Sequence, residues 1–126
     1  KNGGAFYTSN ALLTSRQSIF RENQADQGGL FYISENSVLM THQAEFGNNR
    51  AKIATIIYCV QDSKFKLQSQ TIIEGNHAEE TALIRALHSK GSRIENSTVR
   101  GNEMKSTLFH LFYADLEMSN VVIENN

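Results

Sequence analysis

Residues 28–49, GGLFYISENSVLMTHQAEFGNN, contain the two short motifs that decide the fold. The stretch opens with two glycines followed by Leu30, Phe31 and Tyr32, and it closes with Phe46-Gly-Asn-Asn49. Both motifs return along the chain at a nearly constant interval. Recurrence at a fixed period of about 20–50 residues is the sequence signature of a solenoid, in which each repeat forms one coil.

The closing motif, an apolar residue followed three positions later by asparagine, recurs in every repeat. Its asparagines are spaced by 26, 27, 26 and 24 residues: Asn23, Asn49, Asn76, Asn102 and Asn126. An amide side chain both donates and accepts hydrogen bonds, so stacked asparagines can form a ladder. We therefore predict a structural asparagine ladder in one turn of the coils. Glycine and asparagine tolerate the left-handed backbone of sharp turns, which is our explanation for the Gly-Asn pairs at 47–48, 75–76 and 101–102.

The opening motif aligns into columns, each formed by residues at the same position of successive coils. Four consecutive columns are Ala5, Leu30, Ile56, Leu83, Leu108; Phe6, Phe31, Ile57, Ile84, Phe109; Tyr7, Tyr32, Tyr58, Arg85, His110; and Thr8, Ile33, Cys59, Ala86, Leu111. A looser mid-coil column is Leu13, Leu39, Phe65, Ile94, Leu116. These columns predict three short strands in each of about five coils of 24–27 residues, hence an all-β parallel β-helix. Residues 81–90 also favour a helix by propensity, but their columns match strands in the other coils.

Residues 1–126 form a single predicted β-helix segment without caps of its own. One coil cannot bury enough apolar surface to offset the entropy of ordering its backbone, at about 1–2 kcal/mol per residue. Its strands also need hydrogen-bond partners in the coils above and below. The two end coils would expose sheet edges, which natural proteins cover. We therefore expect the chain to be a fragment of a longer β-helix, with the other coils of that chain as its first partners.

The motifs Gly3-Gly-Ala-Phe6 and Gly28-Gly-Leu-Phe31, alternating with Phe20-x-x-Asn23 and Phe46-x-x-Asn49, resemble the polymorphic outer membrane protein repeats of chlamydiae. Similar repeats occur in large surface proteins of ciliates, and both belong to the pectin-lyase-like class. The resemblance is sharp in the first two coils, whereas later coils replace Gly-Gly with Ala-Thr, Thr-Ala and Ser-Thr. It implies a right-handed β-helix that is displayed at the cell surface and acts in adhesion, without catalytic residues.

Composition and charge exclude several classes of function. The net charge of −1 gives no electrostatic reason to expect nucleic acid or an anionic membrane as partner, and no apolar run is long enough to span a bilayer. Glycoside hydrolysis needs converging carboxylates, but Asp26, Asp62 and Asp115 fall at different stages of three coils. Adjacent Glu79 and Glu80 would diverge in an extended turn.

Metal and thiol chemistry are equally unsupported by the sequence. His77 with Glu80 is a weak metal pair, and the histidines at 42, 77, 88 and 110 occupy different coil positions, so we interpret them as solvated turn residues. The single Cys59 lies in an apolar column and is expected to be a buried, inert thiol. We expect no metal, no cofactor and no catalytic residues in this chain.

The column of Tyr7, Tyr32, Tyr58, Arg85 and His110 is the candidate ligand-facing surface. If its neighbouring columns point inward, strand alternation turns it outward, where it could contact sugar rings or a surface protein. Aligned aromatic residues also stabilise a stack without any ligand. Asn96-Ser97-Thr98 is an N-glycosylation acceptor pattern that matters in a eukaryotic secretory context.

Three functions are compatible with this sequence. The first is a non-enzymatic structural or adhesive segment of a large extracellular or surface-displayed β-helix, anchored outside this segment. The second is a carbohydrate-active β-helix enzyme whose catalytic coils lie elsewhere. The third is a scaffold of an intracellular or ciliary assembly. The first explains the repeated motifs most directly, because all of them serve stacking or surface presentation.

Overall fold

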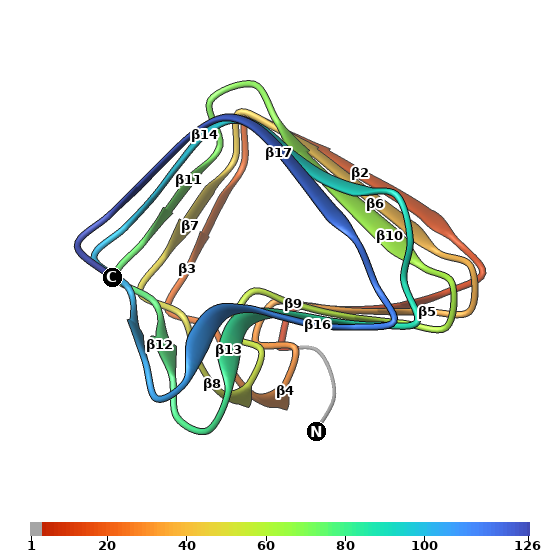
Figure 1. The fold of residues 1–126 in the computed structure, drawn as a ribbon, viewed down its shortest axis with the longest axis horizontal. Helices are drawn as coiled ribbons and strands as arrows, with labels where there is room; N and C mark the ends of the chain where they lie inside the picture. Colours follow the sequence, from red (N-terminus) through yellow and green to blue (C-terminus); the bar gives the residue numbers. More distant parts are fainter. Residues whose placement is uncertain (1–3) are drawn as a thin grey trace.

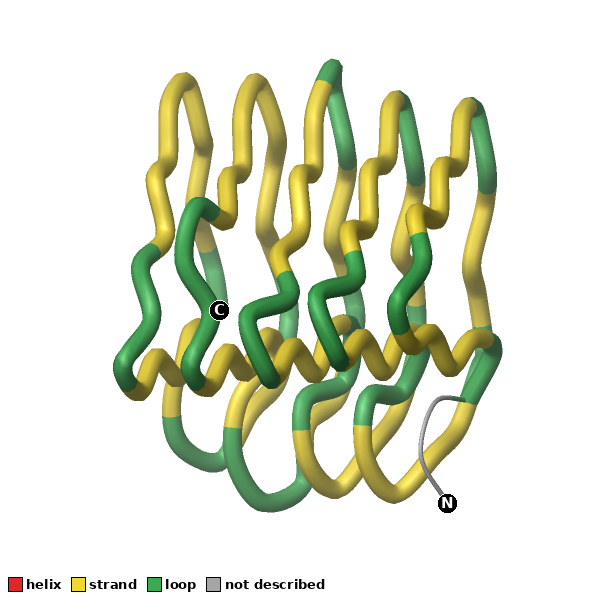
Figure 2. Tube along the Cα trace, turned by 90° about the vertical axis from the view of Figure 1, so that its right-hand side faces the viewer, coloured by secondary structure: helices red, strands yellow, loops and turns green. Residues whose placement is uncertain are grey.

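A computed structural model shows the chain as a stack of coils, and it describes residues 4–126. Strands and turns account for all of the described structure, and the coils lie side by side along one axis (Figure 2). The strands are β1 Phe6–Ser9, β2 Leu12–Arg16, β3 Ile19–Arg21, β4 Gln24–Gln27, β5 Phe31–Ser34, β6 Val38–His42, β7 Glu45–Gly47, β8 Arg50–Ile53, β9 Ile57–Val60, β10 Lys64–Gln68, β11 Ile72–Glu74, β12 His77–Ala78, β13 Ala82–Leu87, β14 Ser92–Arg100, β15 Glu103–Met104, β16 Thr107–Phe112 and β17 Leu116–Glu124.

Each strand pairs in parallel with its counterpart one coil away, so the predicted all-β parallel solenoid of about five coils is confirmed. The first sheet runs β1-β5-β9-β13-β16, with Phe31 paired to Ile57 as predicted. The second and third sides of the coil join into one eight-stranded sheet, because β14 and β17 continue through the corner between them. The segment 81–90, for which a helix was the alternative, contains β13. Viewed down the axis, these three sides form a triangle (Figure 1).

The mid-coil column was predicted correctly in four coils and wrongly in one, at Ile94. Leu13, Leu39 and Phe65 are paired in register. Ile94, however, pairs with Leu67 and not with Phe65. Ser92 takes its place in the column, and Leu116 pairs with Ser92 as the column requires. The error is a shift of two residues, which keeps a side chain on the same face of a strand. An apolar pattern therefore cannot distinguish the two registers.

A fourth parallel ladder, β4-β8-β12-β15, was missing from the prediction of three strands per coil. It forms a small lobe outside the triangle (Figure 1). Its inward residues in the first three coils are Ala25, Ala51 and Ala78, and its other positions in these coils are charged or polar except for Ile53. Alanine gives little apolar signal, so the ladder resembles a polar loop in the sequence.

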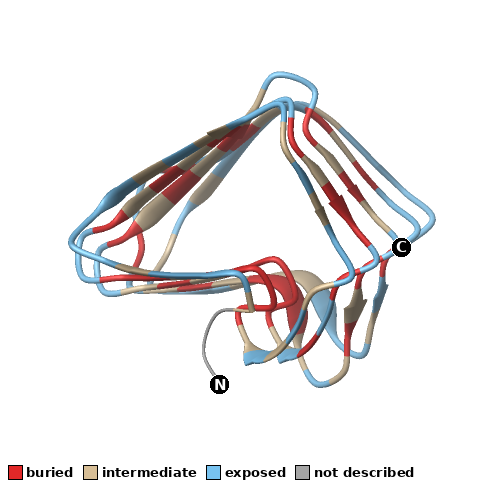
Figure 3. Cartoon of the chain, turned by 180° about the vertical axis from the view of Figure 1, so that it is seen from behind, coloured by how far each residue is buried: buried red, intermediate tan, exposed pale blue. Residues whose placement is uncertain are grey.

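The core consists of the predicted inward columns in the middle coils. Phe31, Ile57 and Ile84 are fully buried, and so are Ile33 and Cys59 beside them. Buried positions lie along the strands and in some of the turns of the middle coils, whereas the outermost coils are more exposed (Figure 3). In the outermost coils the equivalent inward residues are open to solvent: Phe6 is 38% exposed and Leu111 is 39% exposed.

The glycine pairs let the backbones of neighbouring coils approach closely just before the strands of the first sheet. A Cβ on Gly29 would lie 2.2 Å from the carbonyl oxygen of Thr55 in the next coil, and one on Gly4 would lie 2.2 Å from that of Gly29. Gly28 instead has a left-handed backbone, with φ of +56°. Gly3, which was part of the predicted motif, lies outside the described residues.

Candidate functional site

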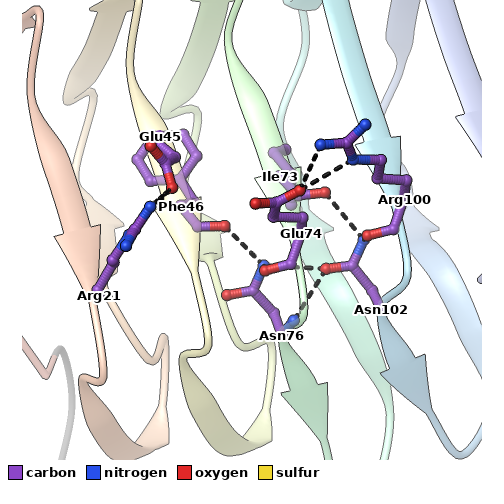
Figure 4. A network of polar contacts seen from close by, with 8 residues as sticks. All are labelled: Arg21, Glu45, Phe46, Ile73, Glu74, Asn76, Arg100 and Asn102. Atoms are coloured by element: carbon purple, nitrogen blue, oxygen red, sulfur yellow. Dashed lines mark hydrogen bonds and ion pairs between the residues drawn. The ribbon is translucent and has the colours of Figure 1, made fainter.

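The five repeated asparagines lie in one column and form a hydrogen-bonded ladder (Figure 4 shows its middle part). Each of the first four asparagines donates both its backbone N–H and its side-chain Nδ2 to the Oδ1 of the asparagine one coil further along. For Asn49 to Asn76 these distances are 3.0 and 2.9 Å, and for Asn76 to Asn102 they are 3.1 and 2.9 Å. Asn49 and Asn76 are fully buried, and Asn102 is nearly so. Asn23 and Asn126 are the two ends of the same chain of bonds.

The same amides also bind strand carbonyls, so each side chain is used completely. Asn76 Nδ2 donates to the carbonyl of Phe46 at 2.9 Å and to that of Glu74 at 3.0 Å. Asn102 makes the equivalent bonds to Ile73 and Arg100. The ladder thus satisfies backbone groups that the turn leaves without strand partners, which is a structural role.

The residue before each ladder asparagine has a left-handed backbone. The φ angle is 54° at Asn48, 64° at Gly75 and 57° at Gly101. The proposed explanation for the Gly-Asn pairs is therefore correct at 75–76 and 101–102. At 47–48 it also holds, but there the left-handed residue of the pair is the asparagine, Asn48, and not Gly47. The first and last coils place Glu22 and Asn125 in this conformation.

The candidate ligand-facing column is continuous from Tyr7 to His110. Its members are paired in register along the first sheet, and all but the exposed Tyr7 are half-buried. The rings of Tyr7 and Tyr32 are stacked with centroids 5.3 Å apart, and the ring of Tyr58 meets Tyr32 edge-on at 5.1 Å. The guanidinium carbon of Arg85 lies 5.3 Å from the centroid of the Tyr58 ring.

This stacking changes the chemistry that the column offers. The faces of the Tyr7 and Tyr32 rings are turned toward each other, so a ligand meets ring edges and hydroxyl groups along the column. Partial burial raises the pKa of the Tyr32 hydroxyl, with a smaller contribution from Tyr58 and Tyr7, so Tyr32 remains a neutral donor and acceptor. From the sequence we considered that the tyrosines could stack on sugar rings. In the structure less of their ring surface is available to a sugar than three tyrosines in one column would suggest.

Ion pairs connect neighbouring coils on the other faces. Arg100 contacts Glu74 at 2.8 Å, and Arg21 pairs with Glu45 on the same side (Figure 4). His77 Nδ1 lies 3.0 Å from Glu103 Oε2, so the carboxylate that His77 contacts is in the next coil. Because solvent screens these exposed pairs, they contribute little to stability.

The remaining candidates take structural positions. His42, His77 and His110 lie in strands, so the interpretation of all four histidines as turn residues was wrong; His88 alone lies between strands. Asp26 lies in β4, whereas Asp62 and Asp115 share the corner after the first sheet, two coils apart. Asp115 accepts a hydrogen bond from the Gly91 N–H. Within residues 4–126, no group of three or more potential ligands is arranged to hold a metal ion.

Asn96 lies at an exposed corner inside β14, where its backbone is left-handed with φ of 48°. Its Oδ1 accepts a hydrogen bond from Asn120 Nδ2 at 3.1 Å. The acceptor pattern at 96–98 is therefore at the surface of the solenoid, and its modification stays a prediction.

A second polar column, of serines, was missed. Ser37, Ser63 and Ser89 recur every 26 residues and are buried at the corner after the first sheet. Ser63 Oγ accepts from the N–H of Ser37 at 3.0 Å, and Ser89 Oγ donates to the carbonyl of Ser63 at 2.6 Å. The equal spacing was visible in the sequence, but serine is common enough that the repeat was not distinctive.

Cys59 is buried in the core, and its Sγ lies 3.3 Å from Ser89 Oγ. Burial raises the pKa of the thiol to about 12, and the contact with Ser89 opposes this only partly. We predict that a thiol reagent at about pH 8.5, the ordinary pKa of free cysteine, labels the native protein slowly and the denatured protein fully. Rapid labelling of the native protein would contradict this.

The same shift has a consequence for stability. The unfolded chain loses its thiol proton at a lower pH than the folded chain does. The unfolding free energy should therefore fall as pH rises from the ordinary thiol pKa toward about 12. Cys59→Ala should lack this contribution, which denaturant titrations at several pH values can measure.

Comparison of the chain with models of protein families, with curated proteins and with solved structures finds no match. Within the part that the structure describes, no helix has the length and apolarity needed to cross a membrane.

Proposed function

We propose that this chain is a non-enzymatic structural and adhesive segment of a large extracellular or surface-displayed β-solenoid. The right-handed sense and the polymorphic outer membrane protein type of repeat, which the Gly-Gly-Ala-Phe and Phe-x-x-Asn motifs imply, are part of this proposal. Its first partners are the neighbouring coils of the same chain. Glycans or surface proteins are the external partners.

The observation that carries the proposal is the in-register column from Tyr7 to His110. Each coil presents one member of the column on the same face of the first sheet, at strand spacing of about 4.8 Å. Repetition of similar groups along a rigid axis favours multivalent contact, in which weak individual bonds add up. The ladder asparagines and the core columns, by contrast, contact other coils of the stack.

Binding measurements with a matched pair of triple variants test the adhesive role. The first variant replaces Tyr7, Tyr32 and Tyr58 with alanine. The control replaces Thr14, Met40 and Lys66, which form an outward column in the same three coils on the neighbouring face. Beads coated with each protein are compared on cell surfaces and on a glycan panel, after unfolding curves have shown that both variants fold.

We expect the tyrosine variant to lose most of the binding and the control to keep it. Equal binding by both variants would remove the column from the proposal. Incubation with a polysaccharide panel should release no new reducing or unsaturated ends. Their appearance would overturn the non-enzymatic role.

A further inference from the structure

The outer face of the first sheet changes in character along the solenoid axis. Beside the column of Tyr7 to His110 runs a second column, which is Ser9, Ser34, Val60, Leu87, Phe112. Its members are at least partly exposed except for Ser34, which is buried. In the first two coils the face is therefore tyrosine and serine. In the last three coils it combines Tyr58, Arg85 and His110 with an apolar stripe of Val60, Leu87 and Phe112.

Arg85 differs from most arginines of this protein. Arg21, Arg50, Arg93 and Arg100 each pair with a glutamate. Arg85 has no carboxylate within ion-pair distance among the described residues, and it packs over the Tyr58 ring instead. Its Nε is buried without a hydrogen-bond partner. Of the outward strand positions on this face, Arg85 is the one that carries a permanent charge.

The apolar stripe continues to the edge of the face. Phe112 is 52% exposed and Tyr113 at the adjoining corner is 71% exposed. The rings of Phe112 and Tyr113 are 4.6 Å apart, and Tyr113 stacks on His88 at 5.2 Å. Exposed aromatic rings on the same face as an arginine without an ion pair give this face the composition of a protein-interface core, where tyrosine, phenylalanine and arginine are enriched.

We propose that this half of the face binds a protein segment that places a carboxylate on Arg85 and apolar side chains on the Val60–Leu87–Phe112 stripe. This inference rests on the proposed function, and it specifies the kind of partner that the first sheet binds. The missing counter-charge selects an acidic partner, because burying Arg85 against a neutral surface would leave its guanidinium without an acceptor. The stripe selects a protein over a carbohydrate, because it has no hydrogen-bonding group for sugar hydroxyls.

The test is a selection of random 12-residue peptides, displayed on phage, against the whole immobilised chain. We expect enrichment of peptides in which aspartate or glutamate lies next to aliphatic or aromatic residues. Synthetic copies should bind at least about tenfold more weakly to Arg85→Gln, because a charge-assisted hydrogen bond is lost. They should also bind more weakly to Phe112→Ser. Arg93→Gln is the control, because Arg93 lies on another face and pairs with Glu117 at 3.1 Å.

Three outcomes would overturn the proposal: no enrichment, enriched peptides without acidic residues, or equal binding to the wild type and Arg85→Gln. A carboxylated polysaccharide that binds through Arg85 while no peptide does would assign the face to glycans instead. These results are separable from the adhesive role, because a variant with alanine at Tyr7 and Tyr32 alone tests that role on cell surfaces while it keeps the contact of Tyr58 with Arg85.

Discussion

Replacing Gly29 with alanine should destabilise the solenoid by at least about 3 kcal/mol, at or above the upper end of typical overpacking effects. The new Cβ would lie 2.2 Å from the carbonyl oxygen of Thr55 and 3.2 Å from the Cβ of Ala51. The first contact is with the backbone of the next coil, which cannot move without disturbing the pairing of β5 with β9. Chemical denaturation monitored by circular dichroism measures the effect.

Gly47→Ala is the matched control for this prediction. Gly47 is also buried, but a Cβ there would find its nearest neighbour at 3.4 Å, in the flexible side chain of Arg21. Because alanine restricts the unfolded chain, we expect Gly47→Ala to be neutral or to stabilise by up to about 1 kcal/mol. A comparable loss in both variants would show that the close approach of coils at Gly29 is not the cause.

Asn76→Ala should lower the free energy of unfolding by about 3–5 kcal/mol. Leaving a single buried hydrogen-bonding group without its partner costs only about 1–3 kcal/mol. The substitution removes the acceptor of the buried Asn49 N–H and the side-chain donor to the Phe46 carbonyl. It also interrupts the ladder between Asn49 and Asn102. The midpoint of denaturant unfolding should fall accordingly.

Asn23→Ala provides the comparison at the end of the ladder. The Asn23 side chain donates to Asn49 Oδ1 and to the Arg21 carbonyl. Asn49 Oδ1 keeps the bond from the Asn23 backbone N–H after the change. We therefore expect a loss below about 1 kcal/mol. Equal losses at positions 23 and 76 would mean that the ladder has no special weight in the buried coils.

The sequence predicted the features that repeat with bulky or distinctive residues. The register of Phe31 with Ile57 and the column from Tyr7 to His110 follow from aromatic and aliphatic side chains at a fixed period. The predicted register at Ile94 was wrong because a two-residue shift keeps the same side chains on the inward face of the strand. The alanine ladder of β4 and β8 was not predicted, because small side chains leave no apolar pattern in the sequence.

The candidate site was predictable in position but not in chemistry. Alternation along a strand shows that Tyr32 points outward, but it cannot show that its ring stacks on Tyr7. The side-chain rotamer decides whether ring faces or ring edges meet a ligand. In the same way, the absence of a carboxylate near Arg85 depends on the positions of side chains from other coils, which no local pattern specifies.

The direction of the asparagine bonds has a consequence for synthesis on the ribosome. Each asparagine donates to the coil that follows it in the sequence, as Asn23 does to Asn49 and Asn49 to Asn76. In a coil that has just emerged, the backbone N–H of the asparagine therefore awaits an acceptor not yet translated, whereas the side-chain amide already has carbonyl partners, as Asn76 has in Phe46 and Glu74. Because chains emerge N-terminus first, the ladder closes in the order of translation, one coil behind the growing end. The rod is thus completed coil by coil during synthesis, and the asparagine N–H without an acceptor is always in the newest coil.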